Sequence, residues 1–177
     1  MDIEIRPMIN ADLPVLTMMD HSYGTDYVWQ MHLNMDEHEI GVKFAELKLP
    51  RTMRVDYPWP DTRLEESLQQ WDGVMVAVVE GKSVGYLTLV KDEAKREARV
   101  MDLVVNRRLR RRQVGSTLLQ AASVWMSQQG IAKMRLEMQS KNHPAICMAN
   151  YLGYEFSGFA DQYFPNRDIA LFFSRRI

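Results

Sequence analysis

The chain has 177 residues, 46% hydrophobic and 25% charged, values typical of one compact globular domain. Its formal net charge of −1 argues against a surface that attracts nucleic acid or an anionic membrane. The chain has neither a basic, apolar leader nor an apolar run of about 20 residues, so we expect no signal peptide and no membrane-spanning helix. Cys147 is the single cysteine, which excludes an internal disulfide and favours a reducing, cytoplasmic location.

The first part of the chain predicts short and irregular elements. Ile3 and Ile5 alternate with charged residues, as in a half-buried strand, and Asn10–Asp12 is a helix-start signal. The remaining expected elements are two strands at about 29–35 and 42–49, joined by the acidic turn 36–39, and a short helix at 64–71.

The second part of the chain has stronger patterns. Strands are expected at 74–79, 83–90, 98–105, 133–139, 154–160 and 168–173. Apolar residues recur at helical spacing from Val114 to Met126, and a second helix starts near Pro144. This order predicts an α/β (α+β) fold: a mixed, mostly antiparallel central sheet with helices on both faces.

An arginine-rich segment, residues 106–116, lies between a predicted buried strand and a predicted amphipathic helix. The first turn of a helix exposes N–H groups, its dipole favours an anion, and guanidinium groups match phosphate geometry. Gly115 would let a ligand approach the main chain closely. The segment therefore predicts a pyrophosphate-binding turn, with a solvated basic face or a nucleic-acid patch as alternatives. The near-neutral total charge and the absence of interleaved aromatic residues argue against nucleic acid as a partner.

The stretch Arg110–Leu119 resembles the Arg/Gln-x-x-Gly-x-Gly/Ala pattern of the GNAT acetyltransferase superfamily. The strand at 101–105, the stretch Leu136–Gln139 and the pattern Asn142-x-x-Ala145 followed by Gly153-Tyr154 resemble the elements on either side of that family's cofactor. Residues 136–142 and the tail Asp161-x-Tyr163 are most similar to streptothricin-type antibiotic acetyltransferases. The resemblance implies a GNAT-like acyl-CoA N-acyltransferase fold in a single domain, residues 1–177. Its cofactor-binding core would lie at about 74–153 and its acceptor-side elements at about 10–73.

The resemblance also implies acetyl-CoA as co-substrate, without a metal. The amides of Gln113–Thr117 would hold the pyrophosphate, the backbone of Leu103–Val105 would pair with the pantetheine arm, and Asn142 would bond that arm from the other side. The implied cofactor-binding residues are Leu103, Val104, Val105, Arg110, Arg111, Arg112, Gln113, Val114, Gly115, Ser116, Thr117 and Asn142. Gln113 stands where the family usually has its first glycine. We expect this position to need only an amide and no positive φ.

Many members of the family carry a catalytic tyrosine on the last helix, but the matching residue here is Ala149, and Tyr151 is expected to face elsewhere. Tyr163 is the predicted substitute acid. Asp102 and Glu137 are the predicted bases, because each is an acid on a strand expected to border the cleft. Each of these two carboxylates could instead be a structural acid.

The other polar clusters predict no metal site. His32 and His38, with the acids of residues 36–39, match no tight ligand spacing and fit a surface turn better. We expect His143 to belong to a helix start and Cys147 to be packed and unreactive.

Together these features predict an N-acetyltransferase that moves an acetyl group from acetyl-CoA directly to a primary amine of a small molecule or peptide. Asp36–Glu39, Asp56 and Asp61 are predicted to attract a cationic amine such as an antibiotic. The alternative is a coenzyme A-binding module that has lost transfer and acts as a sensor or interaction partner. Four aromatic residues are assigned either to the core or to an acceptor pocket: Trp29, Tyr57, Trp59 and Trp71. The final strands could pair in a homodimer, and no membrane partner is expected.

Overall fold

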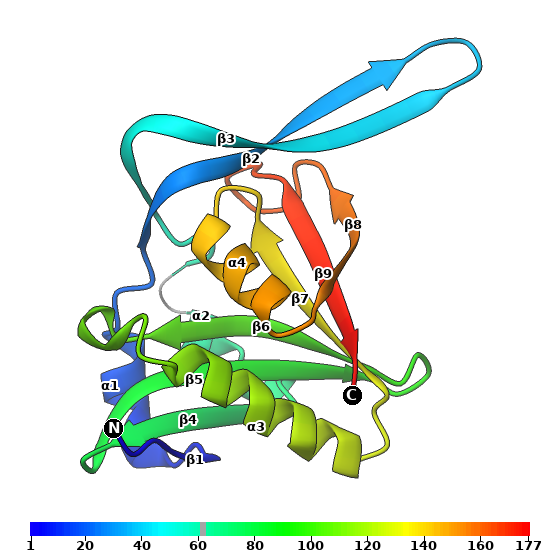
Figure 1. Cartoon of the computed structure of the whole chain (residues 1–177). Coiled ribbons are helices and arrows are strands. Elements are labelled where there is room, and N and C mark those ends of the chain that lie inside the picture. The colour runs from blue at the N-terminus through cyan, green and yellow to red at the C-terminus, as the bar shows by residue number, and fades with distance from the viewer. Residues whose placement is uncertain (61–62) are drawn as a thin grey trace.

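The computed structural model describes residues 1–60 and 63–177. In chain order, the elements are β1 (Glu4–Pro7), η1 (Asn10–Asp12), α1 (Leu13–Thr17), β2 (Tyr23–Met35), β3 (Ile40–Val55), α2 (Arg63–Glu66), η2 (Leu68–Gln70), β4 (Gly73–Val79), β5 (Lys82–Asp92), β6 (Glu97–Val105), η3 (Arg107–Leu109), α3 (Val114–Gln128), β7 (Lys133–Gln139), α4 (His143–Tyr151), β8 (Glu155–Ala160) and β9 (Ala170–Arg176) (Figure 1). Their order follows the order expected from the sequence.

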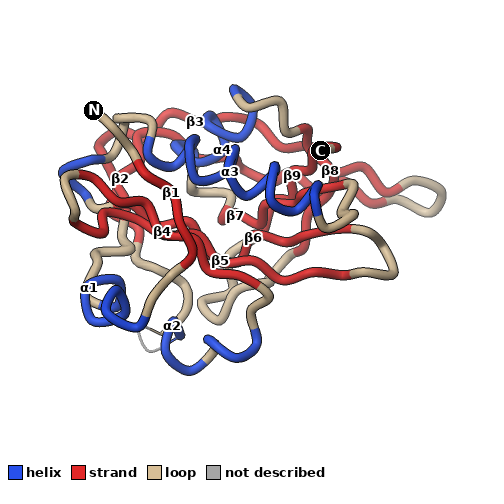
Figure 2. The backbone as a smooth tube through the Cα atoms, turned by 90° about the horizontal axis from the view of Figure 1, so that it is seen from below, coloured by secondary structure: helices blue, strands red, loops and turns tan. Residues whose placement is uncertain are grey.

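Within the described residues, seven strands form one sheet in the order β1-β4-β5-β6-β7-β9-β8. Each neighbouring pair is antiparallel except β6 and β7, which are parallel. Figure 2 shows α1 and α2 on one side of this sheet and α3 and α4 on the other. The predicted mixed, mostly antiparallel sheet with helices on both faces is therefore confirmed.

Each face of the sheet has its own hydrophobic core. On the α3 and α4 side, Leu118 and Met126 of α3 and Ile146 of α4 are almost completely buried against strand residues. On the other side, Leu16 of α1 and Leu64 of α2 pack against strand residues of β4, β5 and β6. Because apolar residues face both cores, β4 has the continuous apolar sequence typical of a strand buried on both faces.

The two parallel strands of the sheet separate soon after they begin. β6 and β7 pair from Glu97 with Lys133 to Val100 with Leu136, and the ladder stops there. A register shift between β5 and β6 leaves Met101 as an extra residue directly after the last pair. A bulge of this kind bends a strand and changes its twist, which is consistent with separation at this point. The later part of β6 keeps β5 as its neighbour and leaves its other edge without a strand.

Strands β2 and β3 form a long two-stranded arm outside the main sheet (Figure 1). The two strands and the turn predicted in this region are confirmed, although both strands are longer than expected. The base of the arm is attached to the main body through the bond from the Trp29 amide to the Ser140 carbonyl, 2.9 Å long, and through contacts of Phe44 with Phe159. The rest of the arm extends into solvent, and Leu33, Met35 and Ile40 near its tip are more than half exposed.

Two expectations about local structure are wrong. The helix expected at 64–71 is two short pieces, α2 and η2, because Ser67 leaves helical geometry between them. The last strand begins at Ala170 and continues to Arg176, so the expected range 168–173 is displaced toward the N-terminus. In the part of the chain that the structure describes, none of the helices is both long and apolar enough to cross a bilayer.

Candidate active site

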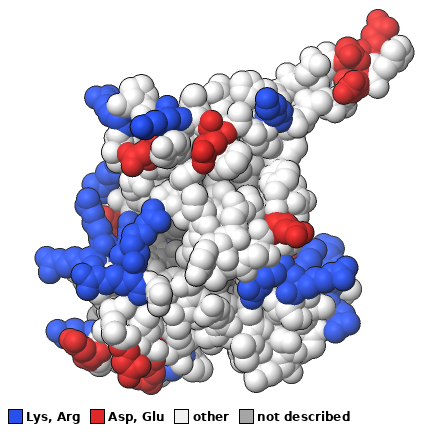
Figure 3. Space-filling model, viewed as in Figure 1, with Lys and Arg blue, Asp and Glu red and all other residues white. Residues whose placement is uncertain are grey.

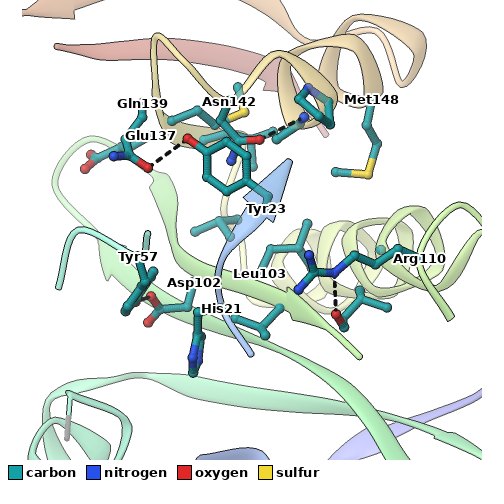
Figure 4. A pocket seen from close by; sticks show the side chains of 18 of the residues that line it. His21, Tyr23, Tyr57, Asp102, Leu103, Arg110, Glu137, Gln139, Asn142 and Met148 are labelled. Atoms are coloured by element: carbon teal, nitrogen blue, oxygen red, sulfur yellow. Dashed lines mark hydrogen bonds between the residues drawn. The ribbon is translucent and has the colours of Figure 1, made fainter. Parts of the chain in front are cut away.

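The space between the separated strands β6 and β7 is a pocket of about 540 Å³. Its walls come from β6, β7, the start of α3, the inner side of α4 and several residues of the first third of the chain. The latter are His21, Tyr23, Tyr57, Pro58, Trp59 and Arg63. Figure 4 shows Arg110 and Met148 at one end of this pocket and Tyr57 and Asp102 at the other. We call these the α3 end and the Asp102 end.

At the α3 end, the helix presents its first main-chain amides to the pocket. Val114, Gly115 and Ser116 all line it, and no side chain caps the helix. The Thr117 amide already donates to the Gln113 carbonyl at 2.9 Å, so Thr117 supplies no free N–H. A Cβ on Gly115 would lie 3.3 Å from the Met148 sulfur and 3.8 Å from Leu103. The absence of that Cβ keeps the space beside the amides open, as an anion site at a helix start requires.

Gln113 has φ 68° and ψ −3°, the left-handed conformation, directly before α3. The expectation that this position needs only an amide is therefore wrong, because the backbone also needs a positive φ. Glycine reaches this conformation without a steric cost, whereas a residue with a Cβ is strained there. The glycine usual in the family thus has a geometric reason, and glutamine adopts the same turn here.

The arginines before α3 have different environments. Arg110 lines the pocket, but its guanidinium donates to three main-chain carbonyls: Val105 at 2.9 Å, Ser22 at 2.6 Å and Asp20 at 2.5 Å. Arg110 therefore ties the start of β2 to the end of β6, and burial lowers the pKa of its guanidinium. Arg111 is exposed and lines the pocket, whereas Arg112 is exposed outside it. Figure 3 shows Lys and Arg side chains gathered over the loop before α3, beside a hollow in the surface.

The side of the pocket between its two ends is the open edge of β6. Leu103, Val104 and Val105 line it, at positions where β6 has no β7 partner. Unpaired main-chain groups at such an edge can bind an extended ligand as a neighbouring strand would. Across the pocket, Asn142 caps α4, its Oδ1 accepting from the Ala145 amide at 3.2 Å. This bond leaves the Asn142 NH₂ group available to the pocket.

At the other end, the Asp102 side chain is only 2% exposed and has three partners. It accepts from the Tyr57 hydroxyl and from Thr88 Oγ1, the latter at 3.0 Å, and its Oδ2 lies 3.9 Å from Arg63 Nε. Burial, followed by the nearby Asp102 charge, holds the pKa of Tyr57 above its usual range. Tyr57 therefore stays a neutral phenol that donates to Asp102.

His21 also lines this end. It is stacked on Tyr57, with ring centroids 4.7 Å apart, and its Nε2 lies 2.7 Å from the Tyr86 hydroxyl. Neither His21 nor Arg63 was identified from the sequence, and Tyr57 was left between core and pocket. The structure assigns Tyr57 and Trp59 to the pocket wall. It assigns Trp29 and Trp71 to the margins of the two cores.

The second predicted base, Glu137, lies on β7 facing the same pocket, and its side chain is 6% exposed. Its Oε1 accepts from Arg135 at 2.7 Å and lies 3.8 Å from Arg99, and its Oε2 accepts from Tyr163 at 2.5 Å. Burial and this bond raise the pKa of Tyr163 to about 12. Tyr163 itself does not line the pocket among the residues described. Glu137 and Tyr163, which the sequence predicted as a base and an acid, are therefore hydrogen-bonded to each other on the β7 side of the pocket.

The model of the acetyltransferase (GNAT) family matches residues 43–154, which include the described pocket residues except His21, Tyr23 and Phe164. This chain belongs to the acetyltransferase (GNAT) family. The resemblance stated from the sequence is confirmed by this match. A search of curated proteins found no match.

Solved structures share the fold over the whole chain. The crystal structure of nourseothricin acetyltransferase has a TM-score of 0.86 at 20% identity, covering 99% of each chain. A putative streptothricin acetyltransferase from Bacillus anthracis str. Ames, in complex with acetyl coenzyme A, has a TM-score of 0.77 at 18% identity, covering 99% of this chain and 100% of that one. The ribosomal-protein-S18-alanine N-acetyltransferase from Escherichia coli has a TM-score of 0.70 at 16% identity, covering 99% and 94%.

Helix α4 of this GNAT protein departs from the family at the position of the usual tyrosine. Ala149 is completely buried in the core and does not line the pocket as described. The pocket-facing residues of α4 include Cys147, Met148 and Tyr151. Tyr151 was expected to face elsewhere, but it borders the pocket while remaining 87% exposed.

Two further expectations about α4 can be compared with the structure. Cys147 was expected to be packed, but it is exposed and borders the pocket, 3.5 Å from His143 Nε2. Burial and the Glu46 charge raise the pKa of its thiol, so little thiolate forms. His143 begins α4 as expected; its Nε2 lies 2.6 Å from Glu46 Oε1, and its ring stacks on Tyr27.

The predicted attraction of a cationic amine by the acidic turn is wrong. Asp36, Glu37 and Glu39 lie at the tip of the projecting arm, away from the pocket (Figures 1 and 3). Asp56 is largely exposed and lies 3.6 Å from Arg54, and Asp61 lies outside the described residues. No cluster of three or more potential metal-ligating His, Cys, Asp or Glu side chains occurs in residues 1–60 and 63–177.

Proposed function

We propose that this protein is an N-acetyltransferase that moves an acetyl group from acetyl-CoA directly to a primary amine. One observation carries the proposal: the open edge of β6 runs from the free amides of α3 to the side chains around Asp102. A ligand with a diphosphate at one end and a reactive thioester at the other fits this arrangement. The putative streptothricin acetyltransferase with the same fold was crystallised with acetyl coenzyme A, which supports the choice of ligand.

In this proposal the amides of Val114, Gly115 and Ser116 hold the diphosphate, and the exposed Arg111 adds positive charge there. The amide groups of the pantetheine arm pair with the edge at Leu103–Val105 and with the NH₂ group of Asn142. Because α3 follows the C-terminal end of β6, a ligand anchored at α3 runs back along the strand and places its thioester near Met101 and Asp102. The fit depends mainly on main-chain groups, so several side chains at this end are free to vary.

We assign the proton transfer to Asp102 and Tyr57. The amine nitrogen forms a bond to the thioester carbon, and the bond from that carbon to sulfur breaks. The proton that the nitrogen loses passes through the Tyr57 hydroxyl to Asp102, to which Tyr57 already donates. The departing thiolate takes a proton from solvent. Glu137 and Tyr163, which bond to each other, have a positioning role on the β7 side of the pocket.

The test compares acetyl-CoA binding with turnover. Acetyl-CoA should raise the melting temperature of the protein, since a ligand that binds the folded state stabilises it. Release of free thiol in the presence of an amine should require Asp102, and Asp102→Asn should lower kcat about 100-fold while acetyl-CoA still stabilises the variant. Asp92→Asn is the matched control, because Asp92 is the last residue of β5, bonds to Lys95 and does not line the pocket in the described residues. Absence of stabilisation by acetyl-CoA would contradict the proposal.

The burial of Ala149 favours the second candidate, a coenzyme A-binding module without transfer. Position 149 presents no hydroxyl to the pocket, so this chain lacks the acid that many family members have. Stabilisation by acetyl-CoA without thiol release for any amine, in wild type and Asp102→Asn alike, would decide in favour of that module.

A further inference from the structure

A second cavity, of about 440 Å³, adjoins the Asp102 end of the main pocket. Trp59, Arg63 and Met101 line both spaces, so the two meet at the bulge of β6. The remaining lining residues are Pro60, Glu66, Ser67, Gln70, Trp71, Val90 and Arg99. The volume is within the range of cavities that hold small molecules.

Arg63 has donor groups that the protein does not use. Its guanidinium stacks on Trp59 at 4.2 Å, and its Nε is 3.9 Å from Asp102 Oδ2, too far for a hydrogen bond. Its Nη1 is buried and has no hydrogen-bond partner among the described residues. A buried N–H group of a charged side chain without an acceptor is costly, and an oxygen acceptor that reached Nη1 would relieve this cost.

Arg99 is the second arginine that lines the cavity. Its side chain is 35% exposed, and its Nη1 lies 3.8 Å from Glu137 Oε1. That oxygen already accepts from Arg135 at 2.7 Å, so Arg99 is the weaker of its two partners. Among the described residues that line the cavity, the charged ones are Arg63, Arg99 and one acid, Glu66. The net positive charge favours an anionic group.

The other side chains of the cavity determine what accompanies that group. Trp59, Trp71, Val90 and Met101 supply apolar surface. Because Met101 also lines the main pocket, a molecule in the second cavity can extend a group toward Asp102 and Tyr57. The two buried carboxylates nearest this point, Asp102 and Glu137, are already paired within the protein, and the acidic turn of the arm is remote.

We propose that the second cavity binds the acceptor, and that the acceptor is a small primary amine that also carries a carboxylate and an apolar side chain. The carboxylate binds Arg63 and Arg99, the apolar group packs between Trp59 and Trp71, and the amine reaches the bulge at Met101. This proposal rests on the proposed transferase function. It replaces the cationic acceptor expected from the sequence with an amine that also carries a negatively charged group.

The experiment measures equilibrium binding by calorimetry, with coenzyme A present and therefore without turnover. The probes are two amino acids, each compared with the amine that lacks its carboxylate: L-phenylalanine with phenethylamine, and L-leucine with isoamylamine. Spermidine is added as a polycation. The amino acids should bind at least about tenfold more tightly than their decarboxylated partners, as expected for a charge-assisted contact to guanidinium groups.

Arg99→Gln should weaken amino-acid binding about tenfold and leave binding of the decarboxylated amines unchanged. Arg99→Lys keeps the charge and should recover part of the loss. Lys95→Gln is the matched control, because Lys95 is 73% exposed and lines neither cavity in the described structure. Circular dichroism and the melting temperature verify that each variant is folded.

Equal or tighter binding of the decarboxylated amines or spermidine, no effect of Arg99→Gln, or no binding of either amino acid would each overturn the proposal. Failure of the transferase function is a separate result, since it appears as amino-acid binding without thiol release.

Discussion

The two ends of the main pocket are built in different ways. The α3 end presents main-chain amides of Val114–Ser116, and its shape depends on one missing side chain, at Gly115. The Asp102 end is built from side chains that come from distant parts of the chain: His21, Tyr57, Arg63 and Asp102. A main-chain site constrains few residue types, whereas a site made of side chains changes with each substitution.

This difference is consistent with a fold that persists while its sequence diverges. Structures at 16–20% identity superpose over almost the whole chain. A backbone turn and an open strand edge survive that much divergence, since every residue type carries the same amide group. The region around Asp102 depends on the identity of its side chains, so substitutions alter it directly. We therefore expect the choice of acceptor to be determined there.

The largest expected effect is at the α3 end. Gly115→Val should weaken acetyl-CoA binding at least about 100-fold, because its side chain fills the space beside the amides and about 3 kcal/mol of charge-assisted bonds are lost. Calorimetry with acetyl-CoA measures the change. The fold should survive, since the nearest atom to the new Cβ is the end of the flexible Met148 side chain.

Gly41→Val is the matched control for Gly115→Val. Gly41 lies on the arm, and a Cβ there would have its nearest neighbours at 3.9 Å. This variant should bind acetyl-CoA as wild type does. Equal affinity of Gly115→Val and wild type would mean that the diphosphate binds elsewhere.

A smaller effect is expected at the other end. Tyr57→Phe keeps the ring stacked on His21 but removes the hydroxyl that donates to Asp102. It should lower kcat about 10- to 100-fold and leave acetyl-CoA affinity unchanged. Tyr27→Phe is the control, because Tyr27 stacks on His143 and does not line the pocket in the described residues. An unchanged kcat would exclude Tyr57 from the proton path.

The pH dependence of wild type tests the same residue. Burial and the Asp102 charge raise the pKa of Tyr57, so the neutral phenol persists above pH 10, where an exposed tyrosine ionises. The rate of acetyl transfer should therefore show no loss from phenol ionisation up to about pH 10. A fall in kcat with a midpoint near 10 that disappears in Tyr57→Phe would show that this phenol has an ordinary pKa.

How much the sequence could predict follows from the same difference between the two ends. The α3 end lies within one continuous stretch, Arg110–Thr117, and the strand before it has a clear apolar pattern. Short sequence patterns therefore predicted the turn, the strand edge and Asn142, all of which line the pocket. They could not reveal that the Arg110 guanidinium is bonded to the carbonyls of Asp20, Ser22 and Val105, since two of these lie about 90 residues away.

The residues around Asp102 could not be grouped in this way. His21, Tyr57 and Arg63 belong to a region with weak periodicity, and only the folded chain brings them to β6. The rigid stretch Tyr57–Pro60, with its alternating aromatic and proline residues, was the available signal. For the acidic turn 36–39, the local structure was predicted correctly, but its position was not. Its distance from the pocket depends on the length of the arm, which the local sequence pattern does not give.

The smallest expected effect concerns Gln113, where the backbone demands a conformation that the residue does not favour. Gln113→Gly should stabilise the protein by about 1 kcal/mol, because a residue with a Cβ is strained at φ 68° by about that amount. For a chain of this length, that gain corresponds to a rise of about 2–4 °C in melting temperature. Acetyl-CoA affinity should not change, since the turn contributes its main chain. Gln120→Gly, at an exposed position within α3, should instead lose about 1 kcal/mol. If both variants are destabilised alike, the Gln113 side chain contributes contacts that outweigh its backbone strain.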